Sequence, residues 1–476
     1  MNPSKCSILF RWIWLCGAGI CLFHPVPADA EEVVTIGSRL EPFVDRFLIE
    51  SMDKAQLRLN TPVPREIVFS FDQPWEGPSS AYCTILQVGN AYRLYYRGYC
   101  PADLDDQQVT CMAESRDGVH FTRPSLGLYE FNGSKENNIV WRGKEAHNFA
   151  PFLDANPQCP PGEKWKALAG LPPVAFVSED GIHWRKKQEQ PVITEGAFDS
   201  QNIAFWDTQA GCYRGYSRSW TQGEFAGFRA IQSATSDDFL HWSRPVMNQY
   251  AAEVPVEHFY TNACIPYPGA PHIFLSFPKR FVPERKKIAE HPEGGVSDAV
   301  FMSSRDGVHW DRCFLEAWIR PGLDRRNWTH RNIMPAWGLL ELSPGEYSLY
   351  HSEHYQWDDA RLRRVTVRKD GFASLHAGAR EGTVLTKPFR FTGSALHLNY
   401  STSAAGSIRV ELLSGQGEPA PGYSGESGAV MFGDALDEIV EWPHGKNLAA
   451  FQDQTVRLRF HLRDADLYTI RFGQGG

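Results

Sequence analysis

Ser115-Arg116-Asp117-Gly118-Val119-His120-Phe121 is the first copy of a phrase that the chain repeats. Clear copies follow at residues 178–184 (SEDGIHW), 236–242 (SDDFLHW) and 304–310 (SRDGVHW), and a looser fifth copy is Lys369-Asp370-Gly371-Phe372. The aligned aspartates are 63, 58, 68 and 64 residues apart. A period of this length indicates one supersecondary unit that is used five times.

Each copy of the phrase lies between extended segments with alternating side chains, such as residues 111–114 before the first copy and 300–303 before the fourth. Asp-Gly between two such segments is a strong signal for a β-hairpin, because a primed turn needs positive φ angles. The phrase therefore predicts a hairpin that recurs five times, with a structural role in packing the blades. Its four histidines alternate with aromatic residues, which favours a surface position over metal binding.

A pair of strands precedes each predicted hairpin. The five pairs are residues 84–88 with 92–97, 150–153 with 165–169, 203–206 with 212–217, 263–267 with 273–277, and 334–337 with 347–350. A strand pair and a hairpin make a four-stranded antiparallel unit, and five such units predict a five-bladed β-propeller. Helical periodicity is weak throughout, which argues against an α/β fold.

The two ends of the chain differ from the repeats. Residues 31–63 look extended, either as an outer strand that closes the ring of blades or as a leading segment, and we favour closure because a ring of sheets needs its ends joined. After Ala377 come short alternating runs at 395–400, 407–412, 456–460 and 467–472, which are typical of a β-sandwich. The predicted fold is all-β, with a five-bladed β-propeller (31–380) followed by a C-terminal β-sandwich accessory domain (381–476).

The first 30 residues have the pattern of a signal peptide. Lys5 and Arg11 precede an apolar run from residue 12 to 23, and Ala28-Asp29-Ala30 supplies a cleavage pattern of small residues. The apolar run is too short to span a membrane. We expect a secreted or periplasmic protein without a membrane span once the signal is removed.

Composition excludes several classes of function. The formal net charge is -8 and there is no basic block, which argues against nucleic acid as a partner. The cysteines left after residue 30 form no close Cys-x-x-Cys pair, and no spacing of ligand residues predicts a metal site. We expect neither a metal nor a cofactor.

Propeller geometry predicts where the chemistry lies. Loops that lead into the first strand of each blade, and loops that join the second and third strands, emerge together at one mouth of the central channel. Asparagines align at the starts of four first strands, as Asn148, Asn202, Asn262 and Asn332. They either ring the mouth and bind sugar hydroxyls or cap turns, as asparagine commonly does.

The same loops carry acids, aromatic rings and basic groups, which together suit a sugar. Two carboxylates can flank a glycosidic bond as acid and base or nucleophile. The candidate catalytic residues, in order of preference, are Asp199, Glu257, Glu353, Asp45 and Glu76, and the other candidate binding residues are His330, Arg331, Arg218 and Tyr260. Nearby loop residues include His147, Arg97, Lys279, Arg280 and Tyr355.

The repeated phrase resembles that of the five-bladed propeller glycoside hydrolases of family 32 (invertases and fructanases) and family 43 (arabinanases and xylosidases). More closely, five phrases resemble exported bacterial proteins described as family-32-like: residues 43–50 (FVDRFLIE), 74–77 (PWEG), 260–263 (YTNA), 320–324 (RPGLD) and 327–332 (NWTHRN). Residues 399–407 (NYSTSAAGS) are similar to the C-terminal module of that group. The resemblance implies an exported glycoside hydrolase that takes a carbohydrate substrate.

The three acidic phrases of the invertases, Trp-Met-Asn-Asp-Pro-Asn-Gly, Arg-Asp-Pro and Glu-Cys, do not occur in this sequence. The resemblance therefore implies the fold more strongly than fructose specificity. Two alternatives stay open, a propeller that binds a glycan without cleaving it and a sialidase-like enzyme. The latter would need three arginines that converge on one carboxylate-binding site, and Arg97, Arg218, Arg280 and Arg331 are available for it.

Overall fold

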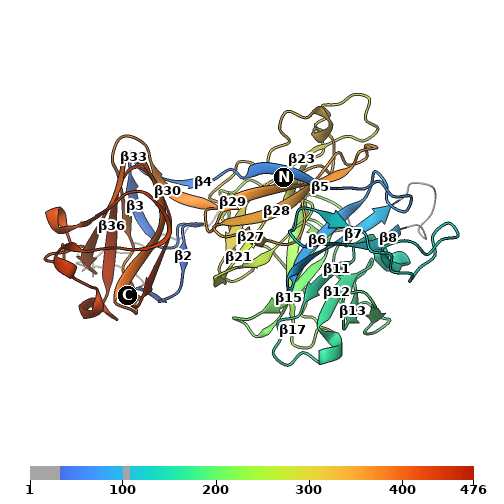
Figure 1. Ribbon diagram of the computed structural model, residues 1–476, viewed down its shortest axis with the longest axis horizontal. Helices are drawn as coiled ribbons and strands as arrows, with labels where there is room; N and C mark the ends of the chain where they lie inside the picture. Colours follow the sequence, from blue (N-terminus) through green and yellow to red (C-terminus); the bar gives the residue numbers. More distant parts are fainter. Residues whose placement is uncertain (1–32, 100–107, 224, 476) are drawn as a thin grey trace, which may run out of the picture.

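The computed structural model describes residues 33–99, 108–223 and 225–475, and these form an all-β protein with two lobes (Figure 1). These ranges contain no α-helix, only short 3-10 segments such as η2 (Lys144–His147) and η4 (Arg325–Asn327). Within them, no helix is long and apolar enough to cross a membrane. The predicted signal peptide, residues 1–30, lies outside the described residues.

Five antiparallel sheets follow one another along the chain and form the larger lobe, as the repeats predict. The first sheet contains β6 (Ala81–Val88), β7 (Ala91–Tyr99), β8 (Gln108–Ser115), β9 (Phe121–Thr122) and β10 (Ile139–Arg142); the second β11 (Ala150–Leu153), β12 (Trp165–Ala169), β13 (Val174–Ser178) and β14 (Arg185–Lys186); the third β15 (Ile203–Asp207), β16 (Cys212–Trp220), β17 (Arg229–Ser236) and β18 (Val246–Met247); the fourth β20 (Ile265–Tyr267), β21 (Ala270–Ser276), β24 (Met302–Ser304) and β25 (Trp310–Asp311). The fifth contains β26 (Met334–Pro335), β27 (Leu340–Ser343), β28 (Glu346–Glu353), β29 (Arg361–Arg368) and β5 (Val63–Ser70). A side sheet of β19 (His258–Phe259), β22 (Lys279–Val282) and β23 (Val296–Ala299) extends the fourth blade.

The ring of blades is closed by β5, which pairs with β29 as the outermost strand of the fifth sheet. We expected residues 31–63 to close the ring, and that expectation is wrong for most of the segment. Strands β1 (Val34–Gly37), β2 (Glu41–Pro42), β3 (Ile49–Asp53) and β4 (Gln56–Leu59) pair with C-terminal strands instead. Alternating side chains predict a strand but not its partner, which explains the error.

The C-terminal lobe is built on two long strands, β33 (Ala395–Ser414) and β36 (Val456–Gly473), which pair along most of their length. They join the four short runs that the sequence predicts into two strands. The other strands are β30 (Ala373–Ala377), β31 (Gly382–Thr386), β32 (Phe389–Phe391), β34 (Ala429–Met431), β35 (Asp434–Ile439) and the N-terminal β1 to β4. The pairing thus places residues 34–59 and 373–377 with this lobe, although the predicted boundaries assigned both to the propeller.

The repeated phrase forms the same turn in four blades. In the first, Ser115 Oγ accepts a hydrogen bond from the Gly118 amide (2.9 Å), and Asp117 Oδ1 accepts from the amides of Val119 (2.9 Å) and His120 (2.8 Å). The first four hairpins are confirmed, but the fifth is not, because β30, which follows Asp370-Gly371, pairs with β4 and β36 instead of β29. The two-residue primed turn is not formed either, because Ser115 pairs with Phe121 and residues 116–120 lie between them, with a positive φ of +72° at Gly118. The aspartate side chain holds the turn in shape by accepting hydrogen bonds from the two following amides, as Asp117 does from Val119 and His120.

Tyrosines on the second strands lock these turns to the neighbouring blade. Tyr95, Tyr216 and Tyr350 donate to the carbonyls of Gly181 (2.9 Å), Gly307 (2.9 Å) and Gly118 (2.8 Å), each in the turn of the next blade. The histidines of the phrase are exposed and bind their own aspartates, as His120 Nδ1 does to Asp117 Oδ2 at 2.7 Å. The phrase has a structural role between blades.

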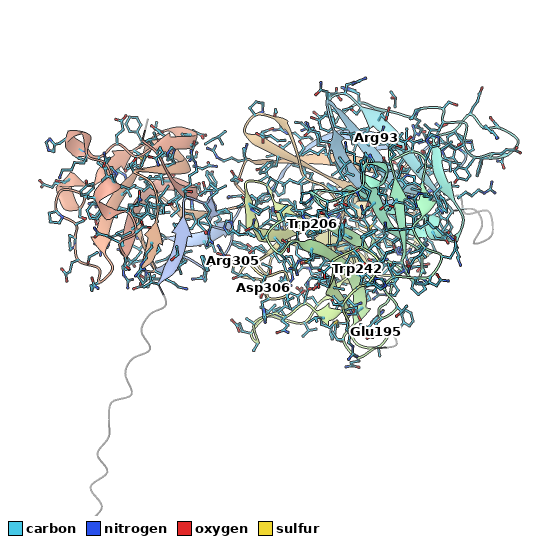
Figure 2. All side chains as sticks on the ribbon, turned by 90° about the horizontal axis from the view of Figure 1, so that it is seen from below. Arg93, Glu195, Trp206, Trp242, Arg305 and Asp306 are labelled. Carbon is cyan, nitrogen blue, oxygen red and sulfur yellow. The ribbon has the colours of Figure 1, made fainter. Side chains whose placement is uncertain are left out.

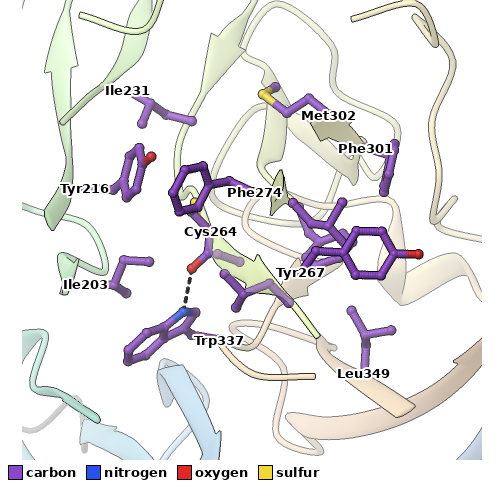
Figure 3. Close-up of a cluster of buried hydrophobic side chains, with 14 of the residues drawn as sticks. Ile203, Tyr216, Ile231, Cys264, Tyr267, Phe274, Phe301, Met302, Trp337 and Leu349 are labelled. Carbon is purple, nitrogen blue, oxygen red and sulfur yellow. Dashed lines mark hydrogen bonds between the residues drawn. The ribbon is translucent and has the colours of Figure 1, made fainter. Parts of the chain in front are cut away.

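The core of the propeller is apolar and aromatic (Figure 3). Trp337 donates its indole N–H to the Cys264 carbonyl (2.7 Å), which ties the fifth blade to the fourth, and Tyr216 and Phe274 lie nearby. The six cysteines in the described residues are all free, and Cys100 lies outside those residues.

Candidate active site

Asp199 is the carboxylate around which polar side chains of the mouth gather. It lies in the loop before β15, and its side chain is 46% exposed. Oδ1 lies 2.9 Å from His147 Nε2 and accepts from the Tyr82 hydroxyl at 3.2 Å. Oδ2 accepts from the Tyr260 hydroxyl at 3.4 Å and lies 3.8 Å from an Arg218 nitrogen. Asp199 therefore presents an oriented, accessible carboxylate.

Every blade contributes to this group of side chains, which we name the mouth cluster. Its members are Tyr82 and Arg97 from the first blade, His147 from the second, Asp199, Arg218 and Arg229 from the third, Tyr260 and Lys279 from the fourth, and Arg331 and Tyr355 from the fifth.

Arginines and tyrosines stack on one another in the mouth cluster. The Arg97 guanidinium lies 4.7 Å from the Tyr82 ring centre, and the Arg218 guanidinium lies 4.7 Å from that of Tyr260. Lys279 Nζ lies 3.8 Å from the Tyr260 ring centre. Cation–π contacts of this kind hold the cations in place without neutralising them.

Tyr355 lies between two guanidinium groups. Its hydroxyl is 3.0 Å from Arg331 Nη1 and 3.4 Å from Arg97 Nη2. Burial would raise the pKa of Tyr355, but the positive charges of Arg97 and Arg331 outweigh burial and lower the pKa below its usual value. The arginines therefore favour the ionised phenol, which is the form that acts as a base or a nucleophile.

Two members of the mouth cluster have left-handed backbone conformations, Tyr82 with φ +53° and Arg331 with φ +60°. A residue with a bulky side chain reaches this region only at a cost in free energy. Both residues lie at the start of a first strand, where the left-handed backbone sets the direction of the side chain. Strain at these two positions accords with a functional role for the cluster.

The electrostatic state of Asp199 follows from its neighbours. Burial would raise its pKa, but the hydrogen bond with His147 and the positive charges of Arg218 and Arg331 hold the pKa of this carboxyl well below its usual range. Burial also lowers the pKa of Lys279 well below its ordinary value, and the charges of Arg331 and Arg229 lower it further. Without a ligand, Asp199 is ionised.

The other candidate acids form ion pairs away from Asp199. Glu257 binds Arg280 and Arg312, each at 2.8 Å, beside the side sheet. Glu353 is buried and binds Arg361 (2.9 Å) and Arg363 (2.5 Å) on the neighbouring strand β29. Both acids are neutralised by arginines. Neither is among the side chains that contact Asp199 in the described residues.

Glu76 and Asp45 are also paired. Glu76 is buried and accepts from Arg123 at 2.8 Å and from the Tyr96 hydroxyl. Asp45 binds Arg305 at 2.8 Å; Figure 2 shows Arg305 and Asp306 on the side of the propeller that is next to the C-terminal lobe. Four of the five predicted acids thus hold the scaffold together, and only Asp199 belongs to the mouth cluster.

The aligned asparagines are buried and bind the backbone. Asn148 Nδ2 donates to the carbonyls of Phe198 (2.8 Å) and Ser200 (3.0 Å), and its Oδ1 accepts from the Gly170 amide (2.7 Å). Asn202, Asn262 and Asn332 likewise donate to backbone carbonyls, and each is at most 2% exposed. Their contacts support the turn-capping alternative, in which they fix the loops that present Asp199 and Arg331.

Of the predicted binding residues, Arg218, Tyr260 and Arg331 lie in the mouth cluster and His330 adjoins it. His330 is buried against Tyr355, and burial together with the Arg331 charge lowers its pKa to about 3, so this imidazole is neutral. A sialidase-like site would need three arginines, and three of the four candidates, Arg97, Arg218 and Arg331, belong to the mouth cluster. Arg280 does not, because it binds Glu257 and Asp298.

Arg229 was missed by the sequence analysis. It begins β17 opposite Trp220 at the end of β16, and its guanidinium lies 5.5 Å from the Tyr260 ring centre. The start of a third strand emerges at the same mouth as the end of the second strand, so extending the alignment to third strands would have found it.

Beside His147 the surface opens into a cavity of about 340 Å³, lined also by Gln108, Lys144, Glu145 and Lys186. Glu145 is neutralised there by Lys186 at 3.0 Å. In the described ranges no group of three or more His, Cys, Asp or Glu side chains could hold a metal ion.

No protein-family model matches the chain, and no curated protein matches its sequence. Similar solved structures include one described as a glycoside hydrolase (12% identity, TM-score 0.45, covering 65% of this chain and 92% of that chain). Others are an N-acetylgalactosamine deacetylase from F. plautii in complex with blood group B trisaccharide (12%, 0.43, 66% and 96%) and the Bombyx mori GH32 beta-fructofuranosidase BmSUC1 (10%, 0.41, 88% and 95%). Since these identities do not exceed 12% and these TM-scores lie below 0.5, the function has to be argued from the site itself.

Proposed function

We propose that the protein is a glycan-processing hydrolase, exported from the cell, that cleaves a glycosidic bond at the mouth of the propeller channel. The observation that carries the proposal is Asp199, a half-exposed carboxylate held by side chains from the first, second and fourth blades. A carboxylate fixed in this way can take a proton from a nucleophile, and once protonated it can donate that proton to a glycosidic oxygen. Tyrosine rings beside it can pack on the apolar face of a sugar.

The second catalytic group in this proposal is a tyrosine rather than a second carboxylate. Tyr355 is the candidate, because Arg97 and Arg331 bind its hydroxyl and favour its ionised form. Most glycoside hydrolases use two carboxylates, but sialidases use a tyrosine as the nucleophile. This observation favours the sialidase-like alternative over catalysis by Asp199 paired with Glu257.

Turnover of a panel of polysaccharides and aryl glycosides by the mature chain tests the proposal. We expect Asp199→Asn and Tyr355→Phe each to lower kcat/KM by about 100-fold or more, because general acid–base groups contribute roughly that factor. The matched control is Asp237→Asn, the same change at an exposed aspartate in the third copy of the repeated phrase.

Full turnover by Asp199→Asn would disprove the assignment. Saturable glycan binding without any product would instead favour the non-catalytic alternative.

A further inference from the structure

The mouth cluster holds more positive charge than its single carboxylate can neutralise. The guanidinium groups of Arg97, Arg218, Arg229 and Arg331 lie around Asp199, and Lys279 lies beside them with a pKa that burial and these charges lower, so the amine is not counted as a full charge. Of these four arginines, Arg218 alone has a carboxylate oxygen of a described residue within 4.0 Å of its charged nitrogens, namely that of Asp199 at 3.8 Å. The site therefore carries a strong positive excess.

Arginines with low exposure elsewhere in the propeller are paired. Arg123 binds Glu76, Arg305 binds Asp45, and Arg312, whose side chain is fully buried, binds Glu257, all at 2.8 Å. A buried charge is costly unless it is paired, and these pairs follow that rule. The arginines of the mouth cluster are an exception to this pairing within the same lobe. We infer that they bind a ligand rather than stabilise the fold.

Buried donors in the mouth cluster also lack partners. Lys279 is 0% exposed and its Nζ has no hydrogen-bond partner among the described residues. Arg97 is 5% exposed, and its Nε likewise has no acceptor in the described ranges. Unmet donors at this depth need an explanation, and an anionic ligand would supply the acceptors.

We propose that the mouth cluster binds an anionic sugar, whose carboxylate or sulfate group lies against Arg97, Arg218 and Arg331. The planar guanidinium group matches both anions, because two of its N–H groups can bind two oxygens at once. Tyr82 and Tyr260 border the same space and suit the sugar ring. The proposal rests on the proposed function only in taking the ligand to be a sugar.

Binding of an anion should also change the protonation of Asp199. A bound anion offsets the charges of Arg218 and Arg331, which hold Asp199 ionised in the free protein. The carboxyl then gains a proton more readily, so anion binding and proton uptake favour each other. A carboxyl that binds a proton more readily is better suited to donate it to a glycosidic oxygen.

Binding is measured by calorimetry on the full mature chain, which requires no turnover. The probes are glucuronate, glucose 6-sulfate and glucose, which share a ring and differ at C6, together with galacturonate, galactose 6-sulfate and galactose. We expect at least about tenfold tighter binding of one anionic form than of its neutral counterpart. Preference for the uronate identifies the anion as a carboxylate, and preference for the sulfated sugar identifies it as a sulfate.

The test variant is Arg331→Gln, for which we expect at least about tenfold weaker binding of the preferred anionic sugar. Arg244→Gln is the control, because it removes the same charge from an exposed arginine whose partner is the exposed Glu195. Circular dichroism of both variants verifies folding, and Arg218→Gln provides a second test if Arg331→Gln does not fold. Repeating the titration in buffers with different ionisation enthalpies measures the expected proton uptake.

Binding of neutral and anionic forms with equal affinity overturns the inference, even if a neutral glycan is cleaved. Tight binding of an anionic sugar that is never cleaved from any glycan supports the inference and contradicts the proposed function. The two failures are thus distinguishable.

Discussion

Lys279→Met should stabilise the ligand-free protein while it weakens the binding of anions. Lys279 is fully buried at the start of β22, its Nζ has no partner among the described residues, and it faces Arg218, Arg229 and Arg331. Methionine has a similar length and no polar group to satisfy. The substitution removes an unmet buried donor and retains the packing against Tyr260.

The expected gain follows from the cost of the unmet amine. A buried polar group without a partner costs about 1–3 kcal/mol, so we expect the free energy of unfolding at neutral pH to rise by about that amount. The folded pKa of Lys279 lies below the unfolded value of 10.5, so the unfolded chain binds the extra proton between these two values. The wild type therefore loses up to about 1.4 kcal/mol for each pH unit below 10.5 until its folded pKa is reached.

Urea unfolding followed by tryptophan fluorescence at several pH values measures this effect. The advantage of Lys279→Met over the wild type should be largest at low pH and should shrink as the pH approaches 10.5. Lys164→Met is the control, because Lys164 is exposed and exposed substitutions usually change stability by less than about 0.5 kcal/mol. Loss of stability in Lys279→Met at every pH, with an unchanged pH slope, would refute the reasoning.

Three further substitutions test the scaffold. Asp370→Asn should raise the free energy of unfolding at pH 7 by up to about 3 kcal/mol, because burial raises the folded pKa of Asp370 from 3.8 to about 6 and the wild type loses stability as the pH rises from 3.8 to 6. Unfolding at pH 3.5 and pH 7 measures the difference between the variant and the wild type. If the stability of both proteins depends on pH in the same way, the prediction is contradicted. Gly181→Ala should destabilise the propeller by about 2 kcal/mol or more, since φ is +76° and the new Cβ would lie 2.6 Å from the Tyr95 hydroxyl; a smaller loss in thermal unfolding would show that the turn can move aside. Arg305→Leu should cost about 3–5 kcal/mol by leaving Asp45 unpaired, and calorimetry should show a lowered midpoint; a midpoint equal to that of the wild type would contradict the predicted role of this ion pair.

The fold was predictable from the sequence because the signal for each blade is local. The Asp117 and Asp180 turns are fixed by hydrogen bonds to amides two and three residues away, so the four clear copies of the phrase give the same hairpin. The two strands before each phrase lie close in the sequence and pair with one another. The N-terminal strands β1 to β4 could not be placed in this way, since their partners lie more than 300 residues along the chain.

The candidate site was only partly predictable, because charge pairing across strands cannot be seen in the sequence. Glu353 looked like a mouth acid, but Arg361 and Arg363 on the adjacent strand neutralise it. Asp199 and Arg331 were identified from loop position, yet the feature that distinguishes Asp199 is that no arginine binds it closely. Whether a carboxylate has an arginine partner depends on how all the charged side chains of the lobe pair. That pairing can be seen only in the three-dimensional structure.

The two faces of the propeller divide stability and function between them. At the strand ends that carry the repeated turns, Tyr95 and Tyr350 donate to glycine carbonyls of the next blade, so these carbonyls have partners and the contacts stabilise the ring. On the mouth face, Tyr82 and Tyr355 instead contact Asp199 and arginines whose charges are not neutralised. Because the repeated turns join the blades without help from the mouth, the mouth can keep unpaired cations that would be costly in a smaller fold. An anionic ligand would neutralise those cations. The free energy that the unpaired cations cost the ligand-free protein would then be recovered on binding and would contribute to the affinity for the ligand.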